Sequence, residues 1–286
     1  MNVLVATDGS KYGRWALEWV AQLPLVEPAK VLALHVLDIG AVRAPFRSQP
    51  AMAGSEGYIQ DEIRRMDTRS AKTITDAKKQ LAALKLKGTV CKEQGAIAPV
   101  ILKRAPKRAG LLVVGSKGLD ALDRFMLGSV STTLIHHATC PVLVVKTKAA
   151  PVRRITLATD GSNASVKALE FVRTKLQPDR STGKGGRVPI QVSVIHVMPF
   201  SNYQELKEAR KLLEQSVRML TQAGFTAEAV CLSGRPAEEI MKVAAKQHAE
   251  LIVMGAQGLG AIARFLLGSV STRVVQHATC SVLVVR

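Results

Sequence analysis

Residues 124–145 read RFMLGSVSTTLIHHATCPVLVV, and residues 264–285 read RFLLGSVSTRVVQHATCSVLVV. These two stretches are identical at 16 of 22 positions. The beginnings of the two halves match as well, because LVATDGS at residues 4–10 returns as TLATDGS at residues 156–162. Agreement at both ends indicates that one domain occurs twice in the chain.

The duplication predicts two domains, residues 1–147 and residues 152–286. The connector Lys148-Ala149-Ala150-Pro151 is short and holds the proline expected of a linker. At 286 residues, the chain is long enough for two compact domains of ordinary size.

Within each half, apolar β-branched runs alternate with helical patterns. Residues 111–114, for example, are apolar on both faces, which is typical of a parallel strand covered by helices. The alternation predicts an α/β fold of three layers around a parallel sheet in each half. We expect strands at 3–6, 31–36, 89–93, 111–114 and 142–145 in the first half, and at 155–158, 191–197, 227–231, 251–254 and 282–285 in the second. We expect helices at 11–22, 58–86, 100–107, 129–137, 164–175, 203–223, 236–247 and 269–277.

Three segments differ between the halves. Residues 38–57 show no periodicity and contain two prolines, so we expect a surface loop. Residues 178–186 are rich in glycine and charge, which favours a flexible loop. The second half has Gly-Arg-Pro at 234–236 where the first has Gly-Ala-Ile at 95–97. In the first half, Pro106 is expected to kink or end the helix that follows Gly-Ala-Ile.

Composition limits the class of protein. With 47% hydrophobic and 22% charged residues, the chain is neither disordered nor fibrous. No apolar run reaches the roughly 18 residues of a membrane span, and the start shows no secretory signal, so we expect a cytoplasmic protein. The net charge of +18 divides equally between the halves and favours anionic partners without choosing among them.

The four cysteines lack the spacing of a zinc site or a disulfide framework. Cys91 and Cys231 are 140 residues apart, as are Cys140 and Cys280. We therefore expect each pair to occupy one packing position of the repeated fold.

Glycines follow the fourth strand of each half in a fixed pattern. Gly115-Ser116-Lys117-Gly118 precedes nine residues and Gly128-Ser129, and Gly255-Ala256-Gln257-Gly258 precedes nine residues and Gly268-Ser269. Glycines after a strand let backbone N–H groups approach a ligand. Gly-Ser at the start of a helix predicts unpaired N–H groups, a hydroxyl N-cap and the positive end of a helix dipole, which together bind anions. Turn chemistry explains one such pattern, but its repetition favours a binding site.

Asp8 and Asp160 follow the first strand of each half. One interpretation is an Asx turn or helix cap. The other is a carboxylate beside a nucleotide, on a sugar hydroxyl or a magnesium ion. In open parallel sheets, ligands lie beyond the carboxyl ends of the strands where the strand order reverses, so the aspartate and the glycine loop would share one crevice.

Each half resembles a universal stress protein (UspA family) domain, whose ATP-binding signature is G-2x-G-9x-G-[S/T]. The resemblance covers nearly the whole chain. It implies a Rossmann-like, five-stranded parallel sheet in the order 3-2-1-4-5, with an adenine nucleotide in the crevice. It also implies dimerisation through the last strand, so we expect the two terminal strands to pair as an intramolecular pseudo-dimer. The sequence leaves a further homodimer open.

The resemblance implies ATP as the ligand, with magnesium held indirectly by Asp8 and Asp160. Contacts to the nucleotide would come in the first half from Ala6, Thr7, Asp8, Val36, Val114, Gly115, Lys117, Gly118, Gly128, Ser129, Val130 and Ser131. In the second half they would come from Ala158, Thr159, Asp160, Val197, Met254, Gly255, Gln257, Gly258, Gly268, Ser269, Val270 and Ser271. Because Lys117 is charged and Gln257 is not, the two sites are expected to differ in affinity.

The main hypothesis is a nucleotide-binding stress regulator without catalytic residues. Slow ATP hydrolysis is the first alternative, although the turn after the first strand lacks the Ser-Gly-Gly run of related adenylating enzymes. A nucleotide-free scaffold is the second. The third is nucleic-acid binding through a basic helix, but such a helix is more typical of a solvated face and 11 aromatic residues offer few stacking platforms. The basic residues are Arg64, Arg65, Arg69, Lys72, Lys78 and Lys79.

Overall fold

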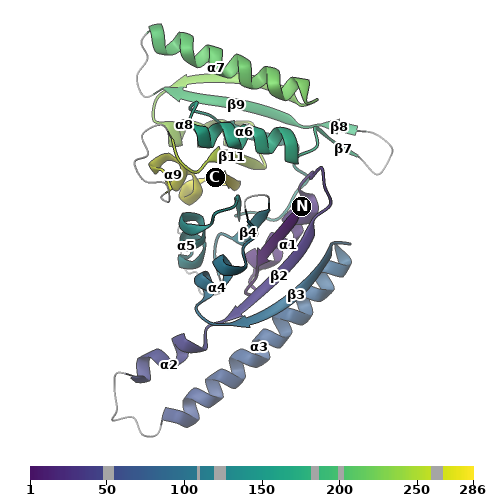
Figure 1. Cartoon of the computed structure of the whole chain (residues 1–286), viewed down its shortest axis with the longest axis vertical. Helices are drawn as coiled ribbons and strands as arrows, with labels where there is room; N and C mark the ends of the chain where they lie inside the picture. The colour runs from purple at the N-terminus through teal and green to yellow at the C-terminus, as the bar shows by residue number, and fades with distance from the viewer. Residues whose placement is uncertain (48–54, 108–109, 119–126, 182–186, 199–202, 259–266) are drawn as a thin grey trace.

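The structure is a computed structural model of the chain and describes residues 1–47, 55–107, 110–118, 127–181, 187–198, 203–258 and 267–286 (Figure 1). The first half contains β1 (Asn2–Ala6), α1 (Lys11–Gln22), β2 (Lys30–Leu37), α2 (Ile39–Arg47), α3 (Ser55–Ala83), β3 (Lys87–Gln94), α4 (Ile97–Arg104), β4 (Leu111–Gly115), α5 (Ser129–His137) and β5 (Val142–Val145). The second contains β6 (Arg154–Ala158), α6 (Asn163–Lys175), β7 (Asp179–Ser181), β8 (Arg187–Pro189), β9 (Gln191–Met198), α7 (Tyr203–Gln222), β10 (Thr226–Ser233), α8 (Pro236–Lys246), β11 (Leu251–Gly255), α9 (Ser269–His277) and β12 (Ser281–Val285).

A single ten-stranded sheet runs through both halves in the order β10-β9-β6-β11-β12-β5-β4-β1-β2-β3. Numbered within its own half, each set of five strands has the order 3-2-1-4-5, and all its pairs are parallel. The halves meet where β5 and β12 pair antiparallel, with Leu143 opposite Leu283. The expected pairing of the terminal strands is therefore present, and two apolar edges become the centre of one sheet.

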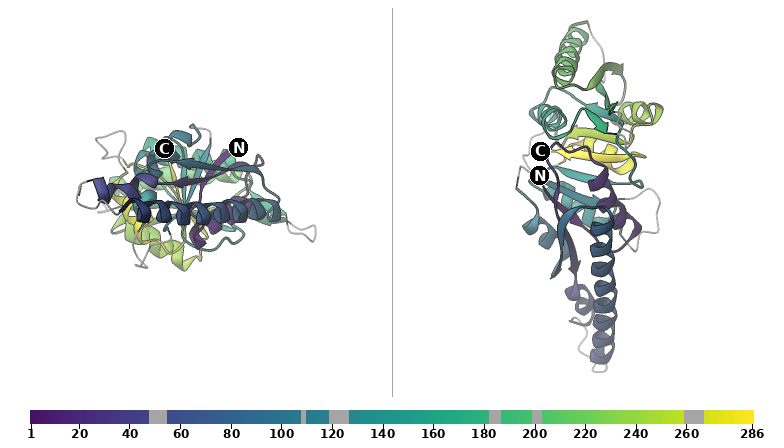
Figure 2. Two further views of the ribbon diagram at one scale, coloured as in Figure 1. Left: turned by 90° about the horizontal axis from the view of Figure 1, so that it is seen from below. Right: turned by 90° about the vertical axis from the view of Figure 1, so that its right-hand side faces the viewer.

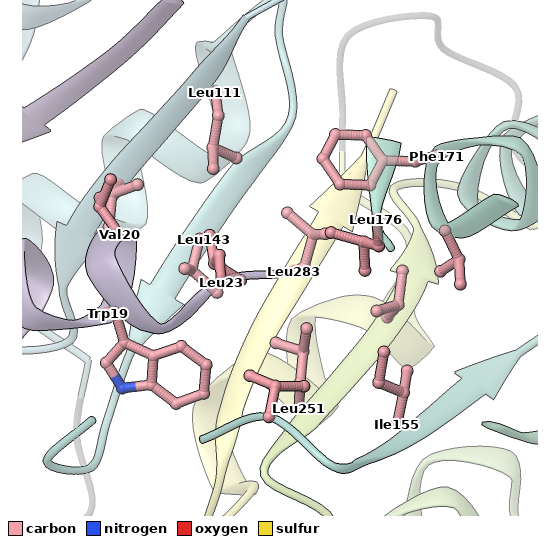
Figure 3. Packing of buried hydrophobic residues seen from close by; sticks show 14 of the residues in the cluster. Trp19, Val20, Leu23, Leu111, Leu143, Ile155, Phe171, Leu176, Leu251 and Leu283 are labelled. Atoms are coloured by element: carbon pink, nitrogen blue, oxygen red, sulfur yellow. The ribbon is translucent and has the colours of Figure 1, made fainter. Parts of the chain in front are cut away.

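Helices cover both faces of this sheet. On one face, α1, α3, α6 and α7 pack over a hydrophobic cluster that is continuous across both halves, and α4, α5, α8 and α9 do the same on the other face. Figure 3 shows Leu23 and Leu143 from the first half and Leu176 and Leu283 from the second in the first of these clusters. Because both cores cross the boundary, the two halves are packed as one body.

The prediction of a loop over residues 38–57 is wrong for 39–47, which form α2. Asp38 Oδ1 accepts the backbone N–H of Ala41 at 3.0 Å, so this aspartate caps the helix. Pro45 lies late in the helix and concealed it from a search for periodicity. α3 is 29 residues long and begins at Ser55; Figures 1 and 2 show its N-terminal part extending past the sheet beside α2.

The basic face of α3 carries its own counter-ions. Arg64 lies 3.7 Å from Asp61, and Arg65 lies 3.6 Å from Glu62, each pair three residues apart on the helix. Such exposed pairs are common on solvated helices and contribute little to stability.

Two further expectations need correction. Residues 179–181, expected in a flexible loop, form β7 and pair antiparallel with β8, whereas residues 182–186 lie outside the described part of the chain. The helix expected at 100–107 is α4, which begins earlier and ends at Arg104. It ends before Pro106 because Ala105 adopts ψ 139°, the extended conformation favoured before a proline.

The expectation for Cys91 and Cys231 is wrong, although they are 140 residues apart. Cys91 pairs with Leu34, and Cys231 pairs with His196, which is the counterpart of His35 rather than of Leu34. The shift of one residue places the two thiols on opposite faces of the sheet. Cys140 and Cys280, by contrast, share one core cluster.

No helix among the described residues is long and apolar enough to span a lipid bilayer.

Candidate functional site

The strand order reverses between β1 and β4, which are neighbours in the sheet. From β1, the strands β2 and β3 follow toward one edge of this half of the sheet. From β4, the strand β5 follows in the opposite direction, toward the other half. In such sheets the loops diverge at the carboxyl ends and leave a ligand crevice there. β6 and β11 repeat this arrangement in the second half. The predicted site residues lie at the ends of these four strands, near the ends of the neighbouring β2 and β9, and at the starts of α5 and α9.

Asp8 lies in a tight turn that joins β1 to α1. Its Oδ1 accepts the backbone N–H of Ser10 at 2.9 Å, and Gly9 adopts φ +81°, where glycine is favoured. Ser10 Oγ accepts the N–H of Gly13 at 3.1 Å and caps α1. The Asx turn that the sequence left open is therefore present, and it uses only Oδ1 of the carboxylate.

The second half repeats this turn closely. Asp160 Oδ1 accepts the N–H of Ser162 at 3.0 Å, and Gly161 adopts φ +79°. Ser162 Oγ also donates to the carbonyl of Gln257 at 3.2 Å, which ties the turn to the loop after β11.

The other carboxylate oxygen, Oδ2, faces the glycine loop. A Cβ placed on Gly118 would lie 3.0 Å from Asp8 Oδ2, and one on Gly258 would lie 2.6 Å from Asp160 Oδ2. A side chain at either position would press on the carboxylate, so glycine allows the loop to approach it. The aspartate and the glycine loop thus converge in each half, as the sequence predicts.

A histidine fixes the strand end next to each aspartate. His35 Nδ1 donates to the carbonyl of Thr7 at 2.9 Å, and His196 Nδ1 donates to the carbonyl of Thr159 at 2.8 Å. These bonds tie β2 to β1 and β9 to β6 beside the crevice. A histidine near the end of the second strand in both halves favours a structural role from the sequence, and the structure shows which carbonyl each histidine contacts.

The helices α5 and α9 begin at the crevice without a capping side chain. Gly128 and Gly268 are the N-caps, so the expectation of a hydroxyl N-cap is wrong. Gly128 N–H donates to the carbonyl of Ser116 at 2.8 Å, which holds the helix start against the loop after β4. The first intrahelical bond runs from Thr132 N–H to the Gly128 carbonyl at 2.9 Å. By helix geometry, the N–H groups of residues 129–131 have no intrahelical acceptor.

The side chain of Ser131 points back to the strand instead of capping the helix. Its Oγ donates to the carbonyl of Gly115 at 2.7 Å, and Ser271 Oγ donates to that of Ala256 at 2.8 Å. Both serines are buried. They therefore orient the helix start, and the partial positive charge of the helix dipole faces the crevice.

The glycines of the motif serve different purposes. A Cβ on Gly115 would lie 2.9 Å from the backbone carbon of Tyr12, so glycine is required there for packing against α1. A Cβ on Gly128 would meet only ordinary contacts, the nearest at 3.5 Å, and the residue has φ −65°. The same holds for Gly268, with φ −68° and a nearest contact at 3.5 Å. The described protein atoms therefore do not explain why residues 128 and 268 are glycine.

Apolar residues form a wall at the carboxyl ends of the strands, on the sheet face covered by α4 and α5. Ala6, Val36 and Val114 are all buried and belong to one cluster at the ends of three adjacent strands. The second half places Ala158, Val197 and Met254 in the same way. Lys117 and Gln257 are partly buried in the loops beyond.

The cysteines of the last strand region stay protonated at neutral pH. Burial raises the pKa of Cys140 and of Cys280 to about 11. Among the described residues, no group of three or more His, Cys, Asp or Glu is placed to hold a metal ion by itself. The site therefore presents backbone N–H groups and one aspartate in each half rather than a metal cluster or an activated thiol.

Comparison with known proteins agrees with this architecture. The model of the Universal stress protein family matches residues 1–146 and 151–286. A universal stress protein of Mycolicibacterium smegmatis is 30% identical over 301 residues, covering 100% of this chain and 97% of that protein. The crystal structure of a universal stress protein from Archaeoglobus fulgidus superposes with a TM-score of 0.71 at 21% identity, covering 100% of this chain and 98% of that one.

A Bacillus subtilis universal stress protein is 32% identical over 145 residues, which covers 46% of this chain and 98% of that protein. Its length corresponds to one half of the present chain. The two family matches, the full-length relative and the shared fold lead to one conclusion: the chain belongs to the universal stress protein family, with the family's domain present twice.

Proposed function

We propose that each half binds an adenine nucleotide, ATP, at the carboxyl ends of its first, second and fourth strands. The phosphates would lie on the N-terminus of α5 or α9, and the purine against the apolar wall. The observation that carries this proposal is the uncapped helix start at Gly128, repeated at Gly268. Three backbone N–H groups and a helix dipole face the crevice there, which is a favourable site for a phosphate group.

The unexplained glycines support the same ligand. Residues 128 and 268 have backbone angles and surroundings that accept a side chain, so their glycines leave space for something outside the protein. A phosphate that approaches the backbone closely needs that space.

Magnesium fits the same site through the aspartates. In Asp8 the turn uses Oδ1, and Oδ2 is directed to the glycine loop where the phosphates would lie. A carboxylate oxygen is a preferred magnesium ligand, and magnesium usually keeps several waters. Asp8 and Asp160 would accordingly hold a nucleotide-bound ion through its water shell, and the ion would neutralise phosphate charge.

The proposed role is regulatory rather than enzymatic. In the crevice, each histidine nitrogen Nδ1 is committed to a backbone carbonyl and each aspartate Oδ1 to a turn. Nucleotide occupancy would then report on the energy state under stress. Slow hydrolysis and a nucleotide-free scaffold remain the competing functions.

The test measures nucleotide released from acid-quenched, purified protein. We expect close to two ATP per chain. Gly128→Glu and Gly268→Glu place a carboxylate on each helix start, and each variant is expected to lose one ATP per chain. Gly57→Glu is the matched control, because Gly57 is exposed on α3 and its Cβ would meet nothing within 4 Å.

Folded protein that carries no nucleotide and binds none in calorimetry would favour the scaffold. Unchanged ATP retention in both glutamate variants would contradict the helix-start assignment. Recovery of ADP after incubation with ATP and magnesium would favour the slow ATPase.

We also propose that the β5–β12 pairing makes the chain an intramolecular pseudo-dimer, which is monomeric in solution. A pair of single-domain proteins would join edge to edge through their last strands in the same manner. Light scattering at micromolar concentration is expected to give the mass of one chain, 30.7 kDa. Twice that mass would show that a further homodimer forms.

A further inference from the structure

A basic groove lies at the amino ends of the first-half strands, on the sheet face that carries α4. It has a volume of about 660 Å³. Its floor is formed by the beginnings of β1, β2 and β3, and its wall by Arg104 and Pro106 at the end of α4. The crevice proposed for nucleotide lies at the opposite ends of the same strands: on β2, Lys30 of the groove and Val36 of the proposed nucleotide site are six residues apart, at about 3.3 Å per residue.

The strand register arranges the groove in two rows. Asn2 pairs with Lys30, and Lys30 pairs with Lys87, so these three residues begin the floor side by side. Two residues further along, Leu4, Leu32 and Thr89 are paired in the same way and point to the same face. The groove is therefore basic at its mouth and apolar next to it.

The lysines stand in an electrostatically unfavourable arrangement. Lys30 and Lys87 are exposed and directly opposite on neighbouring strands, and among the described residues neither has an ion-pair partner. Two positive charges side by side on neighbouring strands repel each other. Arg104 adds a third cation at the wall, where Glu93 is 2.8 Å from its Nε. An anion between these groups would relieve the repulsion.

In the second half, polar side chains occupy the positions that correspond to this groove, and the reason is visible in the sequence. Gly95 and Gly234 occupy equivalent positions. Each donates its backbone N–H to the carbonyl of the last residue of the second strand of its half, and each precedes the helix, α4 or α8, that follows the third strand. Counting from them, Pro106 corresponds to Ala245. Without a proline, α8 continues to Lys246, whereas α4 stops at Arg104.

At the end of the longer helix α8, a polar side chain covers this part of the sheet. Gln247 Nε2 donates to Glu228 Oε1 at 2.9 Å, and Ser193 Oγ donates to the same oxygen at 2.7 Å. Ser193 and Glu228 hold the positions of Leu32 and Thr89. The residues opposite each other at the mouth are Gln191 and Thr226 in place of two lysines. The second half thus fills this position with the carboxylate of Glu228. The first half leaves the position open and surrounds it with cations.

We propose that the basic groove binds an amphiphilic anion, a single acidic headgroup on an apolar chain. The headgroup lies between Lys30 and Lys87, with Arg104 at the wall, and the chain lies along Leu32 and Pro106, the partly exposed apolar residues of the lining. This site does not depend on nucleotide binding, because it uses none of the crevice residues.

The experiment titrates the full chain with decanoate, decyl phosphate and decanol by calorimetry, in the presence of saturating ATP. Binding of either anion with at least tenfold preference over decanol supports the proposal, and the stronger of the two identifies the headgroup as carboxylate or phosphate. No anion binding up to 1 mM, equal binding of decanol, or binding seen only without ATP would overturn it.

Variants that copy the second half provide the controls. Lys30→Gln with Lys87→Thr is expected to reduce the affinity at least tenfold. Thr89→Glu, which installs the carboxylate of Glu228, is expected to do the same while keeping both lysines. Lys72→Gln with Lys78→Gln removes the same charge from exposed positions of α3 on the other sheet face, and is expected to change affinity less than twofold. An equal loss in this control would mean that net charge alone attracts the ligand, and would contradict the site.

Discussion

Lys146 and Arg286 occupy the same position at the ends of β5 and β12, and each reaches across the boundary to the last helix of the other half. Lys146 Nζ donates to the carbonyls of Gln276 and Ala278 at 2.9 and 2.8 Å, at the end of α9. Arg286 donates to the carbonyl of Ile135 near the end of α5. A cation at a helix C-terminus is stabilised by the unpaired carbonyls and by the helix dipole.

This reciprocal contact predicts a measurable contribution to stability. Lys146→Met and Arg286→Met each remove charged hydrogen bonds to carbonyls that stay partly buried, so each is expected to lower the free energy of unfolding by about 1–3 kcal/mol. Urea denaturation followed by circular dichroism measures this. Lys148→Met, an exposed lysine of the connector, is the matched control. A loss no larger than the control's would mean that the contacts do not stabilise the boundary.

The buried thiols predict a loss of stability in alkali. Because burial raises the pKa of Cys140 and Cys280 from 9.0 to about 11, the folded protein keeps two protons that the unfolded chain releases between those values. Stability therefore falls from pH 9 to pH 11, at about 1.4 kcal/mol per pH unit for each thiol. Cys140→Ala with Cys280→Ala is expected to flatten this slope, measured by urea midpoints from pH 8 to pH 10.5.

The titration of Lys146 changes the stability of the fold in the opposite direction, over a pH range that overlaps the range of the thiols. Burial lowers its pKa from 10.5 to about 8, so the folded protein has released a proton that the unfolded chain still holds. Stability contributed by this group rises with pH between those values. Comparing Lys146→Met with the native chain from pH 7.5 to pH 9 isolates the effect, because both proteins keep Cys140 and Cys280 and the contribution of the thiols cancels in the difference. A difference that does not change with pH would contradict the burial of the charged amine.

The nucleotide sites are predicted to differ through one residue of the glycine loop. Exchanging Lys117→Gln is expected to weaken ATP binding in the first half about threefold to tenfold, the effect of one charged contact. Gln257→Lys is expected to strengthen the second site by a similar factor. Calorimetry with ATP and AMP measures both, and AMP should respond less because it lacks the outer phosphates. Equal effects on AMP would place the side chain away from the phosphate tail.

Gly13 gives a prediction that opposes helix propensity. A Cβ at this position of α1 would lie 2.8 Å from Thr7 Oγ1 and 3.0 Å from Asp8 Oδ1. Gly13→Ala is expected to destabilise the protein by about 1 kcal/mol, although alanine is the better helix former. The second half has Ser165 here, whose Oγ accepts from Thr159 Oγ1 at 3.2 Å. Gly13→Ser is therefore expected to be the more stable of the two variants in thermal unfolding, and the reverse order would contradict the steric argument.

The sequence predicted the fold well because the repeat gave each pattern twice. Strand order and the convergence of Asp8 with Gly118 followed from the motif and its family resemblance. The prediction from sequence was wrong where the pattern was local and occurred in one half only. An example is α2, whose proline concealed a helix capped by Asp38. The prediction was also wrong for Cys91 and Cys231, because equal spacing in sequence does not fix strand register when a neighbouring connection differs in length.

The contacts of His35 and of Lys146 could not be predicted from the sequence. Both depend on which backbone carbonyl lies within reach, and that is decided only when strands and helices are packed together. The basic groove is an intermediate case. Pro106 predicted a shortened helix, but its consequence for the surface required knowledge of what α8 covers in the other half.

The antiparallel junction of β5 with β12 also determines where the two crevices face. All strands of one half point one way along the shared sheet, and all strands of the other half point the opposite way. The carboxyl ends of the two sets of strands, where we propose the nucleotide sites, consequently lie at opposite edges of the sheet. A rigid partner that docks at one edge of the sheet would therefore contact only one of the two proposed nucleotide sites.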